Sequence, residues 1–237
     1  MLFMAEAYWD LERDLQQLGF DYCYDKRLYD RLVHDNAESV RLHLSAGLDY
    51  QDRLVRFIEN HDEPRAAATF TPEKERAAAL ILMTLPGAKL LYEGQLEGRK
   101  IRPPVFLARR QSEPVDADLQ SFYHHILAVI TQADKLGGAW QLCERSGWPD
   151  NGSYMNMPAW CWSQNESHHL IVVNFSSNQS QARIHLPWNN LAGRTWQLTD
   201  LINGDVFQRD GDEMHLSGLY VDLPAWKFYF LSFKSDQ

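Results

Sequence analysis

A cluster of polar residues follows the apolar run 54–58, and the types of these residues could support catalysis. The cluster contains Asn60, His61, Asp62 and Arg65, and Pro64 prevents the preceding strand from continuing through it. In parallel α/β scaffolds, ligands bind at the carboxyl ends of the strands, where such groups collect. The alternative is an ordinary helix cap with a surface ion pair.

A second candidate site follows the apolar run 2–5, which has the composition of a buried strand. The residues after it include Glu6, Tyr8 and Trp9.

Strands and helices alternate through the first part of the chain, which predicts a parallel sheet covered by helices. Asp10 and Thr71 are the expected N-caps of two of the helices, and Gly19 is the expected end of the first one. The expected strands are 2–5, 20–24, 54–58 and 88–92, and the expected helices cover 10–18, 28–33, 37–46, 72–84 and 117–133. Four such units make half of an eight-unit barrel, and we assign residues 1–136 to this partial barrel domain.

The pattern changes after residue 136 to short runs rich in β-branched and aromatic residues. Turn-forming residues, such as Asn178 and the pairs 203–204 and 210–211, separate these runs. The clearest expected strands are 170–173, 182–186, 195–198 and 226–233. Residues 137–237 are therefore expected to form an antiparallel β-sandwich domain.

Composition excludes several classes of function. The formal charge of −9 over 237 residues argues against a nucleic-acid-binding surface. No apolar run approaches the roughly 18 residues of a membrane span. Three scattered cysteines without a Cys-x-x-Cys spacing support neither a disulfide framework nor a zinc site. Cysteines of this kind are compatible with a reducing compartment, so we expect a cytoplasmic location.

Four features together resemble the alpha-amylase family of glycoside hydrolases. Residues 57–62 resemble the Phe-x-x-Asn-His-Asp motif at the end of the seventh barrel strand of that family, and residues 3–9 resemble the fifth-strand motif that carries its general acid. Residues 85–95 resemble the eighth strand and its loop, and the expected sandwich resembles the C-terminal domain. In that loop the family usually has Gly-Gln-Glu, whereas this chain has Leu96 and Glu97 after Gly94-Gln95, so the resemblance assigns no role to Glu97.

The resemblance implies a role for each matched residue. Glu6 would be the general acid/base, and Asp62 would stabilise an oxocarbenium-like transition state. His61 would donate a hydrogen bond beside Asp62, and substrate contacts would come from Tyr8, Trp9 and Arg65. The resemblance implies no cofactor in this part of the enzyme, because the calcium site of the family would lie in the N-terminal half.

One catalytic group of the family is missing. Its nucleophile is an aspartate in a Gly-x-Arg-x-Asp pattern, and this chain contains no such pattern. Asp25, at the end of the second expected strand, is a poor substitute, because Lys26, Tyr29 and Asp30 around it are typical of a helix start with an ion pair.

These observations predict the C-terminal half of a retaining α-glucan glycosidase or transglycosidase that is inactive alone. Alternatives are a non-catalytic glucan-binding or assembly module and one subunit of a split enzyme. The unpaired outer strands of a half-barrel must be covered. Expected partners are therefore an α-glucan or oligosaccharide substrate, and either an N-terminal half-barrel or a second copy of the chain.

Overall fold

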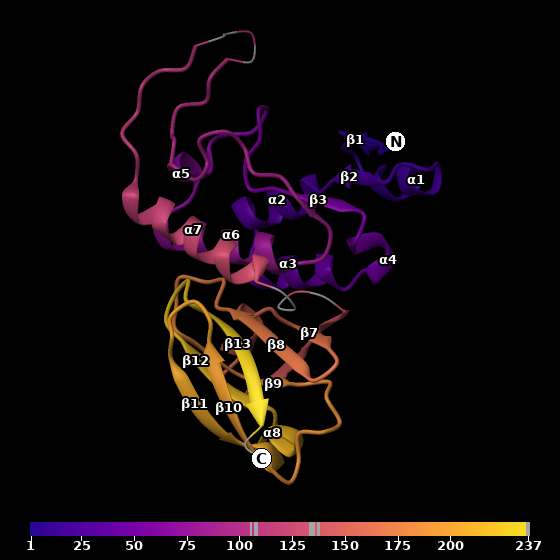
Figure 1. Ribbon diagram of the computed structural model, residues 1–237, viewed down its shortest axis with the longest axis vertical. Helices are drawn as coiled ribbons and strands as arrows, with labels where there is room; N and C mark the ends of the chain where they lie inside the picture. The colour runs from indigo at the N-terminus through magenta and orange to yellow at the C-terminus, as the bar shows by residue number, and fades with distance from the viewer. Residues whose placement is uncertain (105, 107–108, 133–135, 137, 236–237) are drawn as a thin grey trace. The chain divides into compact units, whose positions relative to one another are not determined.

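The computed structural model describes residues 1–104, 106, 109–132, 136 and 138–235, and the chain divides into two compact units (Figure 1). The first unit comprises Met1–Asp35 and Leu42–Leu127. The second comprises Asn36–Arg41 together with the chain from Ala128 onward. In the described part of the chain, no helix is both long enough and apolar enough to span a membrane.

A four-stranded parallel sheet organises the first unit. Its strands are β1 (Met4–Ala5), β2 (Tyr22–Tyr24), β3 (Leu54–Arg56) and β4 (Ala88–Lys89), and they lie side by side in this order. Ala5 is paired with Cys23, and Cys23 with Leu54, so the carboxyl ends of β1, β2 and β3 lie at one edge. The predicted order of strands and their parallel direction are confirmed.

A helix follows each strand of this sheet, and the cap predicted for α6 is present. Thr71 accepts a hydrogen bond from the backbone N–H of Lys74 (3.3 Å) and caps α6, with Pro72 in the first turn as predicted. The buried run from Ala77 to Met83 places α6 in the core of the unit. The helices in this part of the chain are α1 (Glu12–Gln17), α2 (Lys26–His34), α3 (Ala37–Leu44), α4 (Leu48–Gln51), α5 (Ala66–Thr69), α6 (Pro72–Thr84) and α7 (Ala117–Thr131); residues 37–41 of α3 and 128–131 of α7 belong to the second unit.

The prediction that Asp10 caps the first helix is wrong. Asp10 has a positive φ of 66°, and α1 begins at Glu12 with Leu11 as an N-cap that makes no side-chain bond. The Asp10 carboxylate is instead paired with Arg27 of α2 at 2.6 Å. Gly19, with a φ of 103°, follows α1 as expected, since glycine adopts this conformation without strain.

The second unit contains the predicted antiparallel strands in two sheets. One sheet has the order β11-β10-β13-β8-β7-β5, and the other has the order β12-β9-β6. A core cluster of buried residues, including Trp196, Leu198 and Leu231, contains residues from both sheets. The strands are β5 (Ala139–Leu142), β6 (Glu144–Ser146), β7 (Ala159–Gln164), β8 (Ser167–Val173), β9 (Ser180–His185), β10 (Thr195–Asp200), β11 (Val206–Asp210), β12 (Leu219–Leu223) and β13 (Phe228–Ser235), and a 3-10 turn spans η1 (Ser153–Asn156).

The pair Asp210-Gly211 does not form the expected turn between strands. The Asp210 carboxylate accepts hydrogen bonds from the backbone N–H groups of Asp212 (2.8 Å) and Glu213 (3.0 Å), and it thereby caps α8 (Gly211–Ser217). An aspartate before a glycine is compatible with both a turn and a helix cap, and the acidic residues that follow favour the helix.

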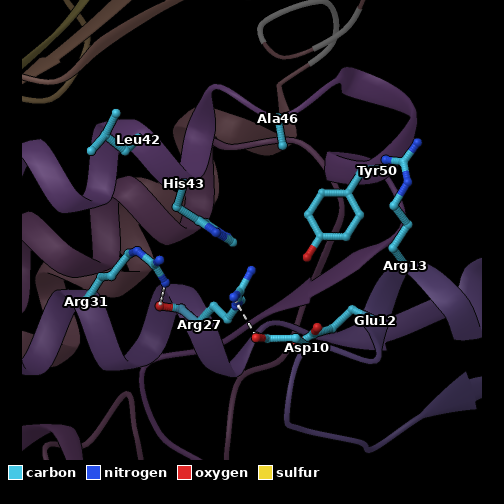
Figure 2. Close-up of a pocket in the computed structure, with 9 residues that line it drawn as sticks. All are labelled: Asp10, Glu12, Arg13, Arg27, Arg31, Leu42, His43, Ala46 and Tyr50. Carbon is cyan, nitrogen blue, oxygen red and sulfur yellow. Dashed lines mark hydrogen bonds and ion pairs between the residues drawn. The ribbon is translucent and has the colours of Figure 1, made fainter.

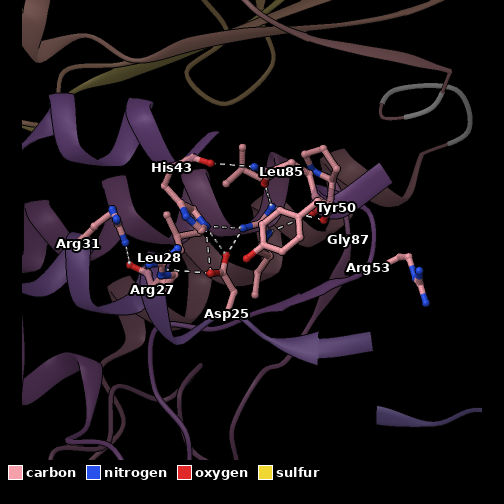
Figure 3. A network of polar contacts seen from close by, with 12 residues as sticks. Asp25, Arg27, Leu28, Arg31, His43, Tyr50, Arg53, Leu85 and Gly87 are labelled. Carbon is pink, nitrogen blue, oxygen red and sulfur yellow. Dashed lines mark hydrogen bonds and ion pairs between the residues drawn. The ribbon is translucent and has the colours of Figure 1, made fainter. Parts of the chain in front are cut away.

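A buried ion pair connects the strands of the parallel sheet (Figure 3). The Asp25 carboxylate, at the end of β2, is paired with the Arg56 guanidinium of β3, and both side chains are at most 1% exposed. Asp25 also lies 3.0 Å from His43 Nε2 and accepts a bond from the Leu28 N–H (3.1 Å), which caps α2. Arg56 Nε donates to the Pro86 carbonyl before β4 (3.3 Å). One interaction thus joins two strands, two helices and the approach to a third strand.

These contacts exclude Asp25 as a substitute nucleophile. Its carboxylate is buried, is neutralised by Arg56 and is used as a helix cap. Burial acts to raise the pKa of Asp25, but the Arg56 charge and the hydrogen bond from His43 outweigh it and hold that pKa below its usual range. The Lys26–Asp30 ion pair expected beside it is present at 2.5 Å.

We predict that Asp25→Asn lowers the free energy of unfolding of the first unit by about 3–5 kcal/mol, because it leaves the Arg56 charge buried without a counterion. Native-state hydrogen exchange of the slowest amides in β2 and β3 measures this change. Asp30→Asn, on the half-exposed Lys26 pair, is the matched control, with an expected loss of about 0–1 kcal/mol. Equal losses in the two variants would contradict the assigned role.

The same pair predicts a pH dependence. Because the pKa of Asp25 is lowered in the folded state, its contribution to stability is complete above the ordinary pKa of an aspartate, about 4. It is lost as the pH falls further, through the folded-state pKa. The difference in stability between the wild type and Asp25→Asn should therefore be constant near neutrality and narrow below about pH 4.

Candidate active site

Three of the expected catalytic and substrate-binding residues meet at the carboxyl edge of the parallel sheet. Glu6 follows β1, and His61 and Asp62 follow β3. Glu6 Oε1 lies 3.8 Å from His61 Nε2, which lies 3.4 Å from Asp62 Oδ2. Their side chains are 38%, 38% and 50% exposed, respectively, so a ligand can reach all three. We call Glu6, His61 and Asp62 the acid cluster.

Tyr8 and Trp9 flank this cluster. The Tyr8 hydroxyl donates a hydrogen bond to Glu6 Oε1 (3.3 Å). Burial raises the pKa of Tyr8 to about 12, with a further contribution from the negative charge of Glu6, so the hydroxyl remains a donor near neutrality. Trp9 is 84% exposed, its ring meets that of Tyr8 edge to face (6.1 Å between centroids), and its φ is 67°. A bulky residue in this backbone region is strained, which favours a functional reason for its position.

The turn that presents His61 and Asp62 is held by Asn60. Asn60 is 1% exposed, and its Oδ1 accepts hydrogen bonds from the backbone N–H groups of Asp62 (2.9 Å) and Glu63 (2.8 Å). Arg102 reaches the same turn, because its Nε donates to the His61 carbonyl (3.2 Å) and its Nη2 lies 4.0 Å from Asp62. The sequence alone did not indicate Arg102 as a site residue. The one sequence signal is that Arg102 ends the basic run 99–102, which contains two further cationic residues and could meet an anionic ligand.

Arg65 does not join the acid cluster. Its side chain is 1% exposed, and its Nη2 lies 3.1 Å from Glu59 Oε1 and donates to the Glu93 carbonyl (2.9 Å). Its guanidinium also stacks on the Tyr92 ring at 4.8 Å from the centroid. The expected direct contact of Arg65 with a sugar is therefore not supported by its position, because the buried Glu59 carboxylate draws the guanidinium inward.

The Glu59–Arg65 pair connects the two loops that follow β3 and β4. Glu59 Oε2 accepts a hydrogen bond from the Ala66 N–H (2.6 Å), and Arg65 binds the carbonyls of Glu93 and Arg99. Gly94 is needed for this approach, because a Cβ there would lie 2.8 Å from Arg65 Nη2. Burial raises the pKa of Glu59 to about 7, although the Ala66 N–H and the Arg65 charge both lower it.

The acid cluster also has the geometry for a weak metal site. Glu6, His61 and Asp62 each offer one ligand atom, and these atoms lie within 4.8 Å of one another. All three side chains are exposed to solvent, and the imidazole lies where it can pair with either carboxylate. The expectation that this part of the enzyme needs no cofactor stays a prediction.

We predict that Arg65→Lys destabilises the first unit by about 2–3 kcal/mol, because a single ammonium group cannot replace the contacts of a guanidinium with Glu59, Glu93 and Arg99. Hydrogen exchange should also show faster exchange of amides in the loop 94–99. Arg102→Lys, on a half-exposed pair, is the control, with an expected change of about 0–1 kcal/mol. Loss of protection spread evenly over the unit, without a local effect at 94–99, would contradict the assigned connection between the loops.

Comparison with known proteins agrees with this geometry. No family model matches the chain. Over 162 residues, which are 67% of this chain, it is 31% identical to the alpha-amylase MalA of Haloarcula japonica, and it spans 22% of that protein. Similar solved structures include the maltogenic alpha-amylase AmyB of Thermotoga neapolitana and the alpha-amylase of Geobacillus thermoleovorans in complex with acarbose. For each of these the TM-score is 0.77 and the identity 16%; the match covers 98% and 100% of this chain, respectively, and 54% of each solved chain.

The chain thus spans about half the length of the solved relatives and a smaller part of MalA. The structural similarity to these solved chains, at only 16% identity, supports the fold alone, namely a partial barrel followed by an antiparallel sandwich. The 31% sequence match to MalA adds the family. In fold, this chain corresponds to about half of the similar solved alpha-amylases, and its sequence match to MalA places it in the alpha-amylase family.

Proposed function

We propose that this chain supplies the acid-bearing wall of an active site that acts on α-linked glucans. The observation that supports this proposal best is the meeting of Glu6, from the end of β1, with His61 and Asp62, from the end of β3, within hydrogen-bond or ion-pair distance. The sequence similarity to the alpha-amylase MalA supports an α-glucan as the substrate class.

Each residue of the acid cluster then has a role in breaking a glycosidic bond. Glu6 donates its proton to the leaving glycosidic oxygen and later accepts one from the incoming water or sugar hydroxyl. The Asp62 carboxylate lies where it stabilises the positive charge that develops on the sugar ring, and His61 donates a hydrogen bond to a sugar hydroxyl. The Tyr8 hydroxyl orients Glu6 (3.3 Å), and the exposed Trp9 ring offers a face on which a sugar stacks.

The roles of Arg65 and Glu59 are indirect in this proposal. Their buried ion pair fixes the loop that carries His61 and Asp62 against the loop after β4, and neither side chain reaches the substrate. Pre-organisation of this kind matters because small displacements of catalytic groups lower the rate strongly.

The isolated chain does not complete the reaction. Retaining hydrolysis needs a second carboxylate as nucleophile on the other side of the sugar, and the sequence contains no Gly-x-Arg-x-Asp pattern to supply one. The only carboxylate that follows β2 directly, Asp25, is held by Arg56. The nucleophile therefore comes from the other half of a barrel.

The outer strands of the sheet are the surfaces that such a half-barrel would pair with. β1 and β4 are the first and last strands of the four-stranded sheet, and each has one neighbouring strand among the described residues. Beside β1 the apolar side chains of Leu2, Phe3 and Met4 are 62%, 51% and 46% exposed. Unpaired parallel edges with exposed apolar residues favour association, with a separate half-barrel or with a second copy of the chain.

We expect the isolated chain to release no measurable sugar from maltoheptaose. Mixed with a polypeptide that carries the Gly-x-Arg-x-Asp half of an alpha-amylase barrel, it should hydrolyse maltoheptaose, and Glu6→Gln should reduce this rate about 10²–10⁴-fold. Glu73→Gln, on the exposed side of α6, is the control and should leave the rate unchanged. Hydrolysis by the chain alone that is abolished by Glu6→Gln would contradict the need for a second half.

Calorimetry separates binding from catalysis. If the acid cluster is the sugar-facing wall, the chain should bind maltoheptaose weakly and saturably, and His61→Ala should abolish the heat, because it removes the side chain between Glu6 and Asp62. His34→Ala, at the exposed end of α2, should bind normally. Binding without turnover, even with the added half-barrel, would favour a non-catalytic glucan-binding module. No heat of binding at millimolar sugar would count against both the catalytic and the glucan-binding function.

A further inference from the structure

The acid cluster brings three metal-binding side chains together at an exposed edge of the first unit. One ligand atom each from Glu6, His61 and Asp62 lies within 4.8 Å of the other two. Among the residues that the structure describes, no other group of three histidine, cysteine, aspartate or glutamate side chains meets this condition. Each of the three side chains is more than a third exposed, so an ion from solvent can reach them.

The spacing of these atoms suits a four-coordinate ion such as Zn²⁺. Zinc binds imidazole nitrogen and carboxylate oxygen at about 2.0–2.2 Å, so its tetrahedral ligand atoms lie about 3.3–3.6 Å from one another. His61 Nε2 lies 3.4 Å from Asp62 Oδ2 and 3.8 Å from Glu6 Oε1. Small rotations of these exposed side chains therefore bring all three atoms to zinc, and the fourth position remains for water.

The types of ligand favour a transition metal over calcium or magnesium. Calcium and magnesium bind through oxygen atoms, so the imidazole in the middle of the cluster offers them nothing. Imidazole nitrogen is a preferred ligand of zinc, and carboxylate oxygen binds zinc as well. The two carboxylates also balance the two positive charges of the ion.

Neighbouring side chains orient the carboxylates without occupying the atoms that face His61. Arg102 Nη2 lies 4.0 Å from Asp62 Oδ1, which leaves Oδ2 directed toward the imidazole. The Tyr8 hydroxyl donates to Glu6 Oε1 (3.3 Å), and a carboxylate oxygen retains a second lone pair for a metal ion. Outer hydrogen bonds of this kind orient metal ligands and raise their affinity for the ion.

A second place where carboxylate and imidazole groups gather lacks these properties. In the pocket of the first unit shown in Figure 2, the Asp10 carboxylate is paired with Arg27 (2.6 Å). The His43 ring of this pocket is bound to the Asp25 carboxylate (3.0 Å), which is neutralised by the buried Arg56. The lining residues of this pocket therefore do not offer a cation two unpaired carboxylates beside an imidazole.

We propose that the acid cluster binds Zn²⁺ and that the bound ion blocks the proposed active site. The ion takes Glu6 Oε1, His61 Nε2 and Asp62 Oδ2 as ligands. Glu6 then neither donates nor accepts a proton, and the Asp62 charge no longer faces a sugar. Zinc acts here as an inhibitor and not as a cofactor. The inhibition rests on the proposed function, whereas the binding of the ion does not.

Calorimetry of the whole chain with Zn²⁺, in a buffer that does not chelate the ion, tests the binding directly. We expect saturable binding of one zinc ion per chain, and no heat from Mg²⁺ at the same concentration. In NMR spectra of the histidine ring nitrogens, zinc should shift the signals of His61. These signals are identified by their absence from the spectrum of His61→Ala.

Two variants locate the ion. His61→Ala should weaken zinc binding by more than the about 10–100-fold that loss of an outer partner costs, because it removes a direct ligand. Asp62→Asn, which preserves the shape of the side chain, should weaken it as well, so the test stands if His61→Ala fails to fold. His34→Ala, at the exposed end of α2, is the control and should bind zinc as the wild type does.

Competition with a sugar tests the inhibition. Because zinc and a glucan need the same atoms, maltoheptaose should weaken zinc binding to the chain. In the mixture of this chain with the Gly-x-Arg-x-Asp half-barrel, zinc should raise the KM for maltoheptaose and leave kcat unchanged.

The possible results separate this inference from the proposed function. Absence of saturable zinc binding, or zinc binding that survives both His61→Ala and Asp62→Asn, would overturn the site. Zinc and maltoheptaose bound together without competition would overturn the inhibition. Zinc binding that is lost in the two variants, in a chain that neither binds nor hydrolyses a glucan, would contradict only the proposed function.

Discussion

The buried ion pair between Asp25 and Arg56 is the interaction on which the rest of the first unit depends. β2 and β3 are three residues each, and β1 and β4 are two residues each, so backbone pairing alone gives the sheet few hydrogen bonds. Asp25 adds the cap of α2 and a contact with His43 of α3, and Arg56 adds a bond to the segment before β4. Because an unpaired charge in this interior would be very unfavourable, the pair keeps these elements in one arrangement.

A second buried ion pair holds the loops that follow the strands. Glu59 and Arg65 hold the loop after β3 to the loop after β4. Within the loop after β3, the Asn60 side chain closes the turn that carries His61 and Asp62. With its supporting charges buried in this way, the loop can present His61 and Asp62 to solvent in a fixed position opposite Glu6. The exposed groups are thus the ones proposed to meet substrate, and the buried groups are the ones that orient them.

The sequence predicted the elements of the fold better than the directions of its side chains. The Thr71 cap follows from a local pattern, and the parallel sheet follows from the alternation of strands and helices. The joint position of Glu6 with His61 and Asp62 was implied by the family resemblance. The pairing of Asp10 with Arg27, and the inward turn of Arg65 toward Glu59 and the loop after Tyr92, depend on residues brought together only by folding. The same limit applies to Arg102, whose contact with the His61 carbonyl spans 41 positions.

The central claim is that Glu6, His61 and Asp62 form one wall of a saccharide-binding cleft. A crystal structure of the chain grown with acarbose, the ligand bound by one of the similar solved alpha-amylases, tests this claim most directly. We predict that a sugar ring lies within hydrogen-bond distance of His61 and Asp62, with a glycosidic nitrogen or oxygen facing Glu6 and a ring stacked on Trp9. Acarbose bound only to the sandwich unit, or bound to the first unit without contact to Glu6, His61 or Asp62, would contradict it.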